Sequence, residues 1–264
     1  MTTIGFQGEP GAFSEAAALA LVPSAATCGF RTFEDLVAAV DGGSVEFGLL
    51  PCENTIHGSI ARAYDLLAER AALRIVDETT QPIAQALIGT PDATLESITC
   101  IASHPIALDQ CRAFLAGRPH VTVRSVDDTA GAVREIVERG DASAAAIGSA
   151  LAAQRYGGRI LLEEVQDFAD NQTRFFLIAR SGASRRGLGR ACLGFELPHR
   201  PGSLRDALSV LADRGLNMRN LVARPSRKRP FEYSFYVEFD CTPELDLGSL
   251  AAQLGDNPRI LGAY

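Results

Sequence analysis

Short strand-like runs alternate with helical patterns over the first two-thirds of the 264-residue chain. Strands are expected at 3–6, 27–30, 47–50, 73–77, 84–88, 98–102, 121–123, 144–147, 160–162 and 174–179, and helices at 13–21, 33–40, 60–69, 105–115, 129–138 and 150–156. This order predicts a mainly parallel α/β sheet in two lobes. The segment 78–85 is expected to cross between the lobes, and the last strands to return to the first lobe.

Composition argues against several classes of partner. The formal net charge is −7 and no basic stripe is present, which argues against nucleic acid. No apolar run approaches the ~18 residues that a membrane-spanning helix needs. The first residues enter a strand pattern directly, without the features of a signal peptide, so we expect a cytoplasmic protein.

The distribution of cysteine, histidine and glycine predicts that the protein uses no metal and no other cofactor. The six cysteines form no C-x-x-C pair, and the four histidines have no i, i+4 partner, whereas a metal site needs clustered ligands. Gly5, Gly8 and Gly11 follow the pattern G-x-x-G-x-x-G, which differs from the G-x-G-x-x-G of dinucleotide sites.

Polar or small residues gather where the expected strands end. In open α/β sheets the ligand binds outside the carboxyl ends of the strands, so these residues are expected around one crevice. Any one of them alone is more often a helix cap or a turn residue, and Ser14 and Thr129 fit such positions well. The segments concerned are 7–11, 53–55, 103–104, 127–129 and Ser149.

The segment 170–179 combines four polar residues with an apolar, aromatic-rich strand, and a linker-like stretch follows it. Thr173 and Phe175 are expected on one face of this strand and Arg174 on the other, because side chains alternate along a strand. A hydroxyl and a guanidinium at the start of a domain's last strand suit a small anion.

The pattern of the C-terminal segment is typical of a compact βαββαβ unit. Its first strand is expected at 191–197, its first helix opens at 199–204, and a second strand covers 217–223. A basic turn at 224–230 is most simply a solvated hairpin loop. The strand at 231–239 alternates cleanly between aromatic and polar residues, and we expect it to be exposed and compatible with a dimer contact.

The ordered motifs together resemble prephenate dehydratase with a C-terminal ACT regulatory domain, over nearly the whole chain. The marks of the resemblance are Gly8-x-x-Gly11-x-Phe13-Ser14-x-x-Ala17, Pro51-Cys52-Glu53-Asn54-Thr55-x-x-Gly58-Ser59, Ser103-His104-Pro105-x-Ala107-Leu108-x-Gln110-Cys111, Asp128-Thr129-Ala130, Ala145-Ala146-Ile147-Gly148-Ser149, Thr173-Arg174-Phe175, Pro201-Gly202-Ser203-Leu204 and Ile260-Leu261-Gly262-Ala263-Tyr264.

The resemblance implies a fold and a division of the chain. Residues 1–181 are expected to form a two-lobed, periplasmic-binding-protein-like α/β catalytic domain with the active site in the interlobe cleft. The first lobe is expected at about 1–78 and 158–181, and the second at about 79–157. A linker at 182–190 then leads to an α+β, ferredoxin-like ACT domain at 191–264.

The family reaction converts prephenate to phenylpyruvate in phenylalanine biosynthesis, with loss of carbon dioxide and of the ring hydroxyl as water. No base has to abstract a C–H proton, so the enzyme must orient a dicarboxylate and supply a donor to the leaving oxygen. By resemblance Thr173 is that donor, and Asn54, Ser103 and Gln110 hold the substrate. The resemblance also implies a substrate-binding role for Ser14, Thr55, Thr129, Ser149, Arg174 and Phe175.

Several readings stay open at this point. Glu53 belongs to the catalytic set, caps a turn or pairs with an arginine. Arg174 either clamps a substrate carboxylate or ties the two lobes together. Departures at His57 and Ile106 favour a shift of substrate preference, for example toward arogenate. A prephenate decarboxylase-like enzyme is a further alternative, against which Thr173 argues. A non-catalytic amino-acid or small-anion sensor with an ACT domain is an alternative of another class.

The ACT motif implies L-phenylalanine as effector and a homodimer through the ACT domain, or a tetramer. The motif usually read Glu-Ser-Arg-Pro is here Val222-Ala223-Arg224-Pro225, which lacks an acceptor and a hydroxyl, so weak or altered feedback inhibition is expected. The residues implied in effector binding are Pro201, Gly202, Ser203, Leu204, Asn217 and Arg224.

Overall fold

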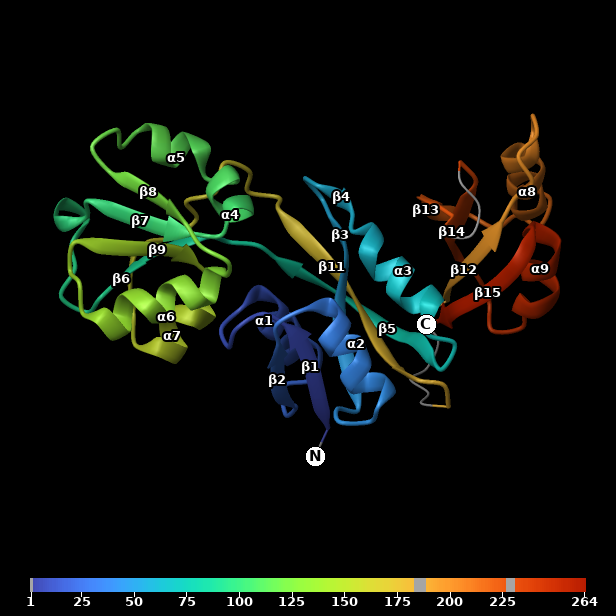
Figure 1. The fold of residues 1–264 in the computed structure, drawn as a ribbon, viewed down its shortest axis with the longest axis horizontal. Coiled ribbons are helices and arrows are strands. Elements are labelled where there is room, and N and C mark those ends of the chain that lie inside the picture. The colour runs from blue at the N-terminus through green and yellow to red at the C-terminus, as the bar shows by residue number, and fades with distance from the viewer. Residues whose placement is uncertain (1, 183–188, 227–230) are drawn as a thin grey trace.

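A computed structural model describes residues 2–182, 189–226 and 231–264. Figure 1 shows three parts in a row: an α/β lobe around β6 to β9, a central lobe around β1 to β3, and a C-terminal unit that contains α8 and α9. The expected linker at 182–190 and basic turn at 224–230 lie partly outside the described residues.

Strands and helices alternate along the first two parts, as the sequence predicts. The helices are α1 (Phe13–Leu21), α2 (Phe33–Asp41), α3 (Ala61–Glu69), α4 (Pro105–Asp109), α5 (Arg112–Ala116), α6 (Thr129–Arg139), α7 (Ala150–Tyr156), α8 (Ser203–Ala212) and α9 (Leu247–Leu254), with a 3-10 turn η1 (Leu95–Ser97). The strands are β1 (Thr3–Gln7), β2 (Ala26–Phe30), β3 (Phe47–Asn54), β4 (Gly58–Ser59), β5 (Leu73–Pro82), β6 (Ala86–Gly89), β7 (Cys100–Ser103), β8 (Thr122–Ser125), β9 (Ala144–Gly148), β10 (Arg159–Leu162), β11 (Gln172–Arg180), β12 (Arg190–Glu196), β13 (Met218–Pro225), β14 (Tyr233–Asp240) and β15 (Asp256–Ala263).

The central lobe and the C-terminal unit share one sheet. Its strand order is β13-β14-β12-β15-β5-β11-β3-β1-β2, with β4 paired to β3. Strands β2, β1 and β3 are parallel, whereas β11 runs antiparallel between β3 and β5. The two-lobed α/β fold with a ferredoxin-like tail is the fold that the sequence predicts. The sheets are mixed, however, and not mainly parallel as expected, because strands such as β11 enter antiparallel to their neighbours.

The second lobe has its own sheet, in the order β10-β6-β9-β7-β8. Strand β10 pairs antiparallel with β6, and its Ile160 lies opposite Ile88. The first residues of the segment 158–181, which we assigned to the first lobe, therefore belong to the second. The alternation pattern identifies a strand but does not tell which sheet accepts it.

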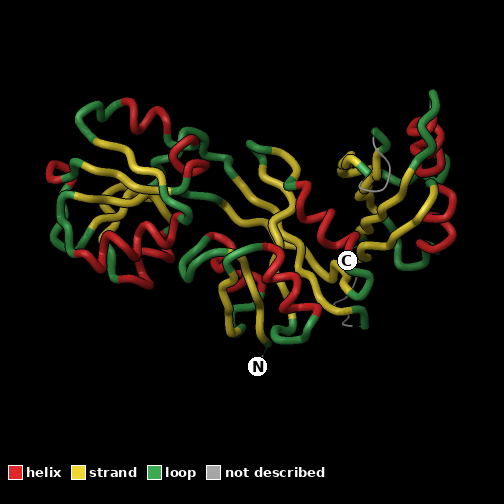
Figure 2. The backbone as a smooth tube through the Cα atoms, in the orientation of Figure 1, coloured by secondary structure: helices red, strands yellow, loops and turns green. Residues whose placement is uncertain are grey.

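Two extended segments connect the lobes side by side. The Ile83 amide donates to the Asn171 carbonyl at 2.8 Å, and the Val165 amide donates to the Gln85 carbonyl at 2.8 Å. Figure 2 shows these segments running between the two sheets. Because the crossing pairs backbone with backbone, the relative position of the lobes depends on the same segments that lead into β11.

The expected helix 105–115 is in fact two short helices, α4 and α5. The chain leaves the helical conformation at Cys111, with φ −120° and ψ 30°, and the Ala113 amide is then capped by the distant Asp167 Oδ1 at 3.0 Å. A cap that comes from 54 positions along the chain cannot be recognised from local periodicity.

In the C-terminal unit, α8 and α9 cover one face of the sheet, and α3 of the central lobe lies against the other. The prediction that the strand at 231–239 is exposed is wrong: β14 pairs with β12 and β13 on its two sides. Val237 and Phe239 pack under the helices, and Tyr236 packs against Tyr64 of α3. None of the helices among the described residues is long and apolar enough to span a bilayer.

The junction between β15 and β5 is a single parallel pair, Gly262 opposite Ile75. A Cβ placed on Gly262 would lie 2.3 Å from the Ile75 carbonyl oxygen and 2.7 Å from its Cβ. The close approach of the two strands therefore requires glycine at this position.

We expect Gly262→Ala to lower the free energy of unfolding by about 1–3 kcal/mol, because the backbone must shift to admit the methyl group. Urea unfolding monitored by far-UV circular dichroism measures the loss. Gly117→Ala is the matched control: Gly117 has φ −69°, and a Cβ there would meet its nearest atom at 3.6 Å. Equal effects of the two substitutions would contradict the tight junction.

Candidate active site

The antiparallel pairing of β3 with β11 brings two sequence motifs together. Asn54 lies opposite Thr173, and Glu53 lies opposite Arg174. The register then shifts between Arg174 and Phe175, at a β-bulge. A bulge redirects the side chains next to it, which is common beside functional sites.

Asn54 is the centre of the hydrogen-bond network at this point, and its side chain is buried. Its two Nδ2 protons are shared among three acceptors: Thr173 Oγ1 at 3.0 Å, the Gln172 carbonyl at 3.0 Å and Asn171 Oδ1 at 2.8 Å. Its Oδ1 accepts from the amides of Ile56 and His57 at 2.9 and 3.0 Å. These contacts fix the orientation of the amide, so Thr173 Oγ1 is an acceptor toward Asn54 and keeps its own proton for another partner.

Thr55 closes the end of the same strand pair. Its Oγ1 donates to the Asp170 carbonyl at 3.0 Å and accepts from the Gln172 amide at 3.0 Å. These bonds hold the segment that precedes Thr173. The Thr55 hydroxyl thus stabilises the backbone that carries the site.

Ser103 and Gln110 come from the second lobe. Ser103, at the end of β7, is fully buried and donates its hydroxyl to the Ile147 carbonyl at 2.6 Å. Gln110 Oε1 accepts from Gln85 Nε2 at 3.1 Å, and the Gln110 carbonyl accepts from the Asp167 amide at 2.7 Å. Gln110 thus lies beside the crossing segments, with its own Nε2 oriented away from Gln85.

Two buried polar atoms near these residues have no hydrogen-bond partner among the described residues. Asn171 Nδ2 belongs to the residue whose Oδ1 accepts from Asn54, and Gln85 Oε1 belongs to the residue that donates to Gln110. Asn171 is 1% exposed and Gln85 is 2% exposed. Buried polar groups are nearly always paired, so these two atoms are exceptions among the described residues.

The loop at 8–11 of the first lobe contacts the second lobe directly. Ser149 caps α7 and donates to the Gly11 carbonyl, and a Cβ on Gly11, which has φ +93°, would lie 2.7 Å from Ala152 Cα. Glu15 of α1, which is buried, pairs with Arg155 of α7. The hydroxyl of Ser149 therefore joins the lobes in this structure.

Ser14 and Thr129 occupy first turns of helices, as expected. Ser14 is the second residue of α1, and Thr129 is the first residue of α6. The cap of α6 is the preceding Asp128, whose Oδ1 accepts from the Gly131 amide at 2.7 Å.

Arg174 points to the opposite face from Thr173 and binds three carboxylates. Its Nε and Nη2 lie 3.1 and 2.9 Å from Glu53 Oε2, and its Nη1 lies 2.9 Å from Glu78 Oε2. Its Nη1 and Nη2 also donate to Oε2 and Oε1 of Glu238, at 2.6 and 3.0 Å. Glu238 belongs to β14, so Arg174 ties the central lobe to the C-terminal unit, which is neither of the two roles proposed from the sequence.

Two tyrosines complete this cluster. Tyr64 Oη donates to Glu238 Oε1 at 2.5 Å, and Tyr264 Oη donates to Glu238 Oε2 at 3.0 Å. Burial alone would raise the pKa of Glu238, but hydrogen bonds and charge from Arg174, with the two tyrosine hydroxyls, lower it below the ordinary value of 4.5. Burial and the nearby Glu238 raise the pKa of the Tyr64 hydroxyl, so it stays a neutral donor.

Phe175 is 2% exposed and packs in the core with Ile4, Leu49 and Val76 on the α1 side of the sheet. It shares the face of Thr173 as predicted, but its ring is a core side chain. Phe176 packs on the other face, edge to face with Tyr64 and Tyr264.

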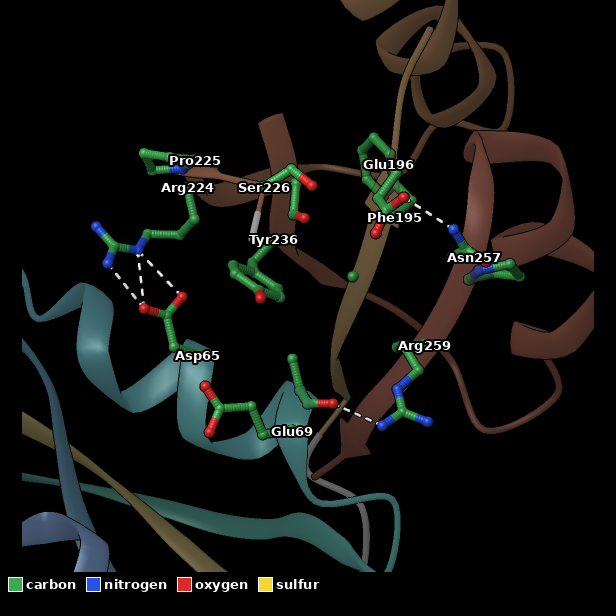
Figure 3. A pocket seen from close by; sticks show the side chains of 14 residues that line it. Asp65, Glu69, Phe195, Glu196, Arg224, Pro225, Ser226, Tyr236, Asn257 and Arg259 are labelled. Atoms are coloured by element: carbon green, nitrogen blue, oxygen red, sulfur yellow. Dashed lines mark hydrogen bonds and ion pairs between the residues drawn. The ribbon is translucent and has the colours of Figure 1, made fainter. Parts of the chain in front are cut away.

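A cavity of about 520 Å³ lies between α3 and the face of the C-terminal sheet that α8 and α9 leave free. Figure 3 shows Asp65 and Arg224 facing each other across one side of it, where Arg224 Nη2 lies 2.8 Å from Asp65 Oδ2. Arg224 is thus placed at this interface. The other residues predicted for effector binding lie elsewhere: Pro201, Gly202, Ser203 and Leu204 at the start of α8, and Asn217 just before β13.

Comparison with known proteins identifies the family. The prephenate dehydratase model matches residues 4–183, and the ACT domain model matches residues 193–256. The chain belongs to the prephenate dehydratase family. As a member of this family it is a lyase with an ACT domain.

Relatives and solved structures agree with this assignment. "Arogenate dehydratase/prephenate dehydratase 1, chloroplastic" of Arabidopsis thaliana is 38% identical and aligns with 99% of this chain and 71% of the relative. A bifunctional N-acyl-homoserine lactone acylase/prephenate dehydratase of Komagataeibacter europaeus is 37% identical, over 99% of this chain and 95% of the relative. The crystal structure of Arthrobacter aurescens prephenate dehydratase in complex with L-Phe is 27% identical, with a TM-score of 0.89, and covers 100% of this chain and 90% of that one.

Sequence reasoning missed Asn171, Tyr64 and Glu238. Asn171 lies two positions before Thr173, the first residue of the Thr-Arg-Phe motif, so its place in the run of four polar residues could have indicated it. Glu238 was placed on the polar face of an alternating strand, and nothing in that pattern tells that α3 covers this face.

We expect Glu238→Gln to lower the free energy of unfolding by about 2 kcal/mol at neutral pH, because hydrogen bonds between charged partners are lost. Folding lowers the pKa of this carboxyl, so its contribution is present above the unfolded-state value and is lost as the pH falls through the lower folded-state value. The difference between wild type and Glu238→Gln should therefore shrink below pH 4.5. Urea unfolding over a pH series measures it.

Exposed Glu138→Gln serves as the control and should show no such pH-dependent difference. The opposite result would be a difference in the free energy of unfolding between wild type and Glu238→Gln that grows as the pH falls. It would show that the carboxyl is protonated in the native cluster.

Proposed function

We propose that this protein catalyses the decarboxylating dehydration of prephenate to phenylpyruvate, carbon dioxide and water, with Asn54 and Thr173 at the reacting end of the substrate. The observation that carries the proposal is the 3.0 Å hydrogen bond from Asn54 Nδ2 to Thr173 Oγ1 in a member of the prephenate dehydratase family. The active site lies between the lobes, where the crossing segments lead into β11.

The reaction needs a hydrogen-bond donor at the leaving oxygen. As the bond between the ring and its carboxylate breaks, the electron pair enters the ring and the ring C–O bond breaks. The departing oxygen takes a proton and leaves as water. Because Thr173 Oγ1 already accepts from Asn54, its O–H is available to the leaving oxygen, and such a preoriented bond is worth ~2–4 kcal/mol as negative charge develops.

Residues of the second lobe and the crossing segments bind the rest of the substrate. Gln110 Nε2 and Asn171 Nδ2 are amide donors suited to the two carboxylates. Ser103 Oγ donates its proton to the Ile147 carbonyl, so in this proposal it can contribute only as an acceptor to the substrate. Ser14 and Thr129, in the first turns of α1 and α6, are further substrate-binding residues in this proposal. Ser149 has a structural role instead, because its buried hydroxyl binds the Gly11 carbonyl.

Arogenate is the second candidate substrate, and the names of the plant relatives support it. Arogenate carries an ammonium where prephenate carries a keto oxygen. Plant relatives of this chain bear both substrate names. Turnover of prephenate compared with arogenate, followed by the spectra of the aromatic products, tests the choice and also separates dehydration from a decarboxylase-like outcome.

We expect Thr173→Val to lower kcat by about 10²- to 10³-fold while KM changes little, because the substitution removes one transition-state donor at nearly constant volume. Steady-state kinetics with prephenate measures this loss, and complementation of a phenylalanine auxotroph checks it in cells. Thr122→Val on the exposed strand β8 is the control and should keep wild-type kinetics.

A wild-type protein that binds prephenate but neither turns it over nor rescues the auxotroph would support the sensor alternative. An unchanged kcat in Thr173→Val would remove this residue from the mechanism.

The ACT domain takes L-phenylalanine as effector in this proposal, and the protein acts in the cytoplasm as a homodimer through that domain. Support comes from the ACT match and from the similar Arthrobacter aurescens enzyme solved with L-Phe. Pro201, Gly202, Ser203, Leu204, Asn217 and Arg224 are the residues proposed for the effector.

We expect weaker inhibition by L-phenylalanine than in relatives that carry Glu-Ser at positions 222 and 223. Val222 is buried against the central lobe and offers no acceptor to an ammonium. Initial rates against phenylalanine concentration measure the effect, with Val222→Glu/Ala223→Ser as the comparison. Strong cooperative inhibition of the wild type would contradict the expectation.

A further inference from the structure

The buried cluster around Arg174 lies one residue away from the pair of side chains assigned to catalysis. Asn54 and Thr173 are paired across β3 and β11, and so are the neighbouring Glu53 and Arg174. The two pairs point to opposite faces of the sheet. The first pair forms the candidate active site, and the second contacts the C-terminal unit through Glu238.

Arg174 is fully occupied by protein groups. Nε, Nη1 and Nη2 all have carboxylate partners, and the side chain is 14% exposed. Bidentate contacts between a guanidinium and a carboxylate impose direction as well as attraction. Arg174 therefore has a fixed position on β11. Glu53 and Glu78 bind it from the central lobe, and Glu238 binds it from the ACT domain.

The backbone at this point has little freedom of its own to compensate. The thiol of Cys52, in the adjacent strand, donates to the Arg174 carbonyl at 3.2 Å, and the register shift follows immediately. A movement of the Arg174 backbone would therefore be transmitted to the bulge or to the adjacent Thr173. Displacements of about 1 Å at a reacting group can cost about 10²-fold in rate.

We propose that Glu238 of the ACT domain is a positioning residue for the dehydration: through Arg174 it sets the orientation of Thr173, so that the regulatory domain controls kcat at this one contact. This inference rests on the proposed role of Thr173. Glu238 touches no substrate and acts only through Arg174.

A second ion pair between the same two parts provides the matched control. Arg224 of β13 pairs with Asp65 of α3, with Nε at 3.0 Å from Oδ1 and Nη2 at 2.8 Å from Oδ2. Asp65 is buried like Glu238, at 8% and 1% exposure. Neither member of this control pair belongs to β3 or β11, so its loss weakens the domain contact without touching the strand that carries Thr173.

The experiment compares Glu238→Gln, Tyr264→Phe and Asp65→Asn in the full-length protein with prephenate as substrate and without phenylalanine. Glu238→Gln should lower kcat about tenfold with KM within about twofold, because orientation of a reacting group is lost and substrate binding is not. Tyr264→Phe removes one donor to Glu238 and should lower kcat by about twofold to threefold. Asp65→Asn should keep the wild-type kcat.

Amide hydrogen exchange of residues 172–176 gives a readout that does not need turnover. Exchange in this segment should accelerate in Glu238→Gln and not in Asp65→Asn. If the wild type fails to convert prephenate, the proposed function is wrong. The exchange comparison still tests whether Glu238 positions residues 172–176 through Arg174. Far-UV circular dichroism establishes that each variant is folded. If Glu238→Gln does not fold, Tyr264→Phe takes its place in the comparison with Asp65→Asn.

Three results would overturn the inference. One is a kcat of folded Glu238→Gln within twofold of wild type. Another is an equal loss of kcat in Asp65→Asn, which would show that general domain packing is responsible. The third is unchanged exchange at 172–176 in Glu238→Gln, or in Tyr264→Phe where that variant replaces it.

Discussion

The pairing of β3 with β11 is the constraint on which both the candidate active site and the domain junction depend. It places Asn54 against Thr173 and, one step further, Glu53 against Arg174. Because successive side chains leave a strand on opposite faces, two adjacent residues serve two separate environments. A small change in this register would move the threonine out of reach of the amide and the guanidinium out of the carboxylate cluster at the same time.

The cluster at the junction is costly to bury and is held by complementary contacts. Arg174 and Arg190 face the carboxylates of Glu53, Glu78 and Glu238, and tyrosine hydroxyls satisfy further oxygen lone pairs of Glu238. Such buried ion pairs are weak evidence of net stabilisation, but removal of one partner leaves a charge uncompensated. These ion pairs restrict the relative orientation of the ACT sheet and β11.

Local periodicity predicted most of the elements, because strands and helices in an α/β fold differ clearly in the spacing of apolar residues. The helix at 129–138, for example, is observed as Thr129–Arg139, with its cap at Asp128. The sequence does not show which surfaces pack against each other. The split after α4 depends on Asp167, and the burial of Glu238 depends on α3. Of the site, motif resemblance indicated Asn54 and Thr173, whereas the partners of Arg174 required coordinates.

The ion pairs between the two lobes differ in solvent exposure. Arg134 and Glu9 pair at 2.7 Å with side chains 40% and 39% exposed, whereas Glu15, the partner of Arg155, is almost completely shielded. Dissolved ions screen exposed charges over about 8 Å at physiological ionic strength and affect shielded charges much less. Raising the salt concentration would thus weaken the exposed Arg134–Glu9 pair before the shielded contact of Glu15, so the two interlobe ion pairs respond differently to the ionic medium.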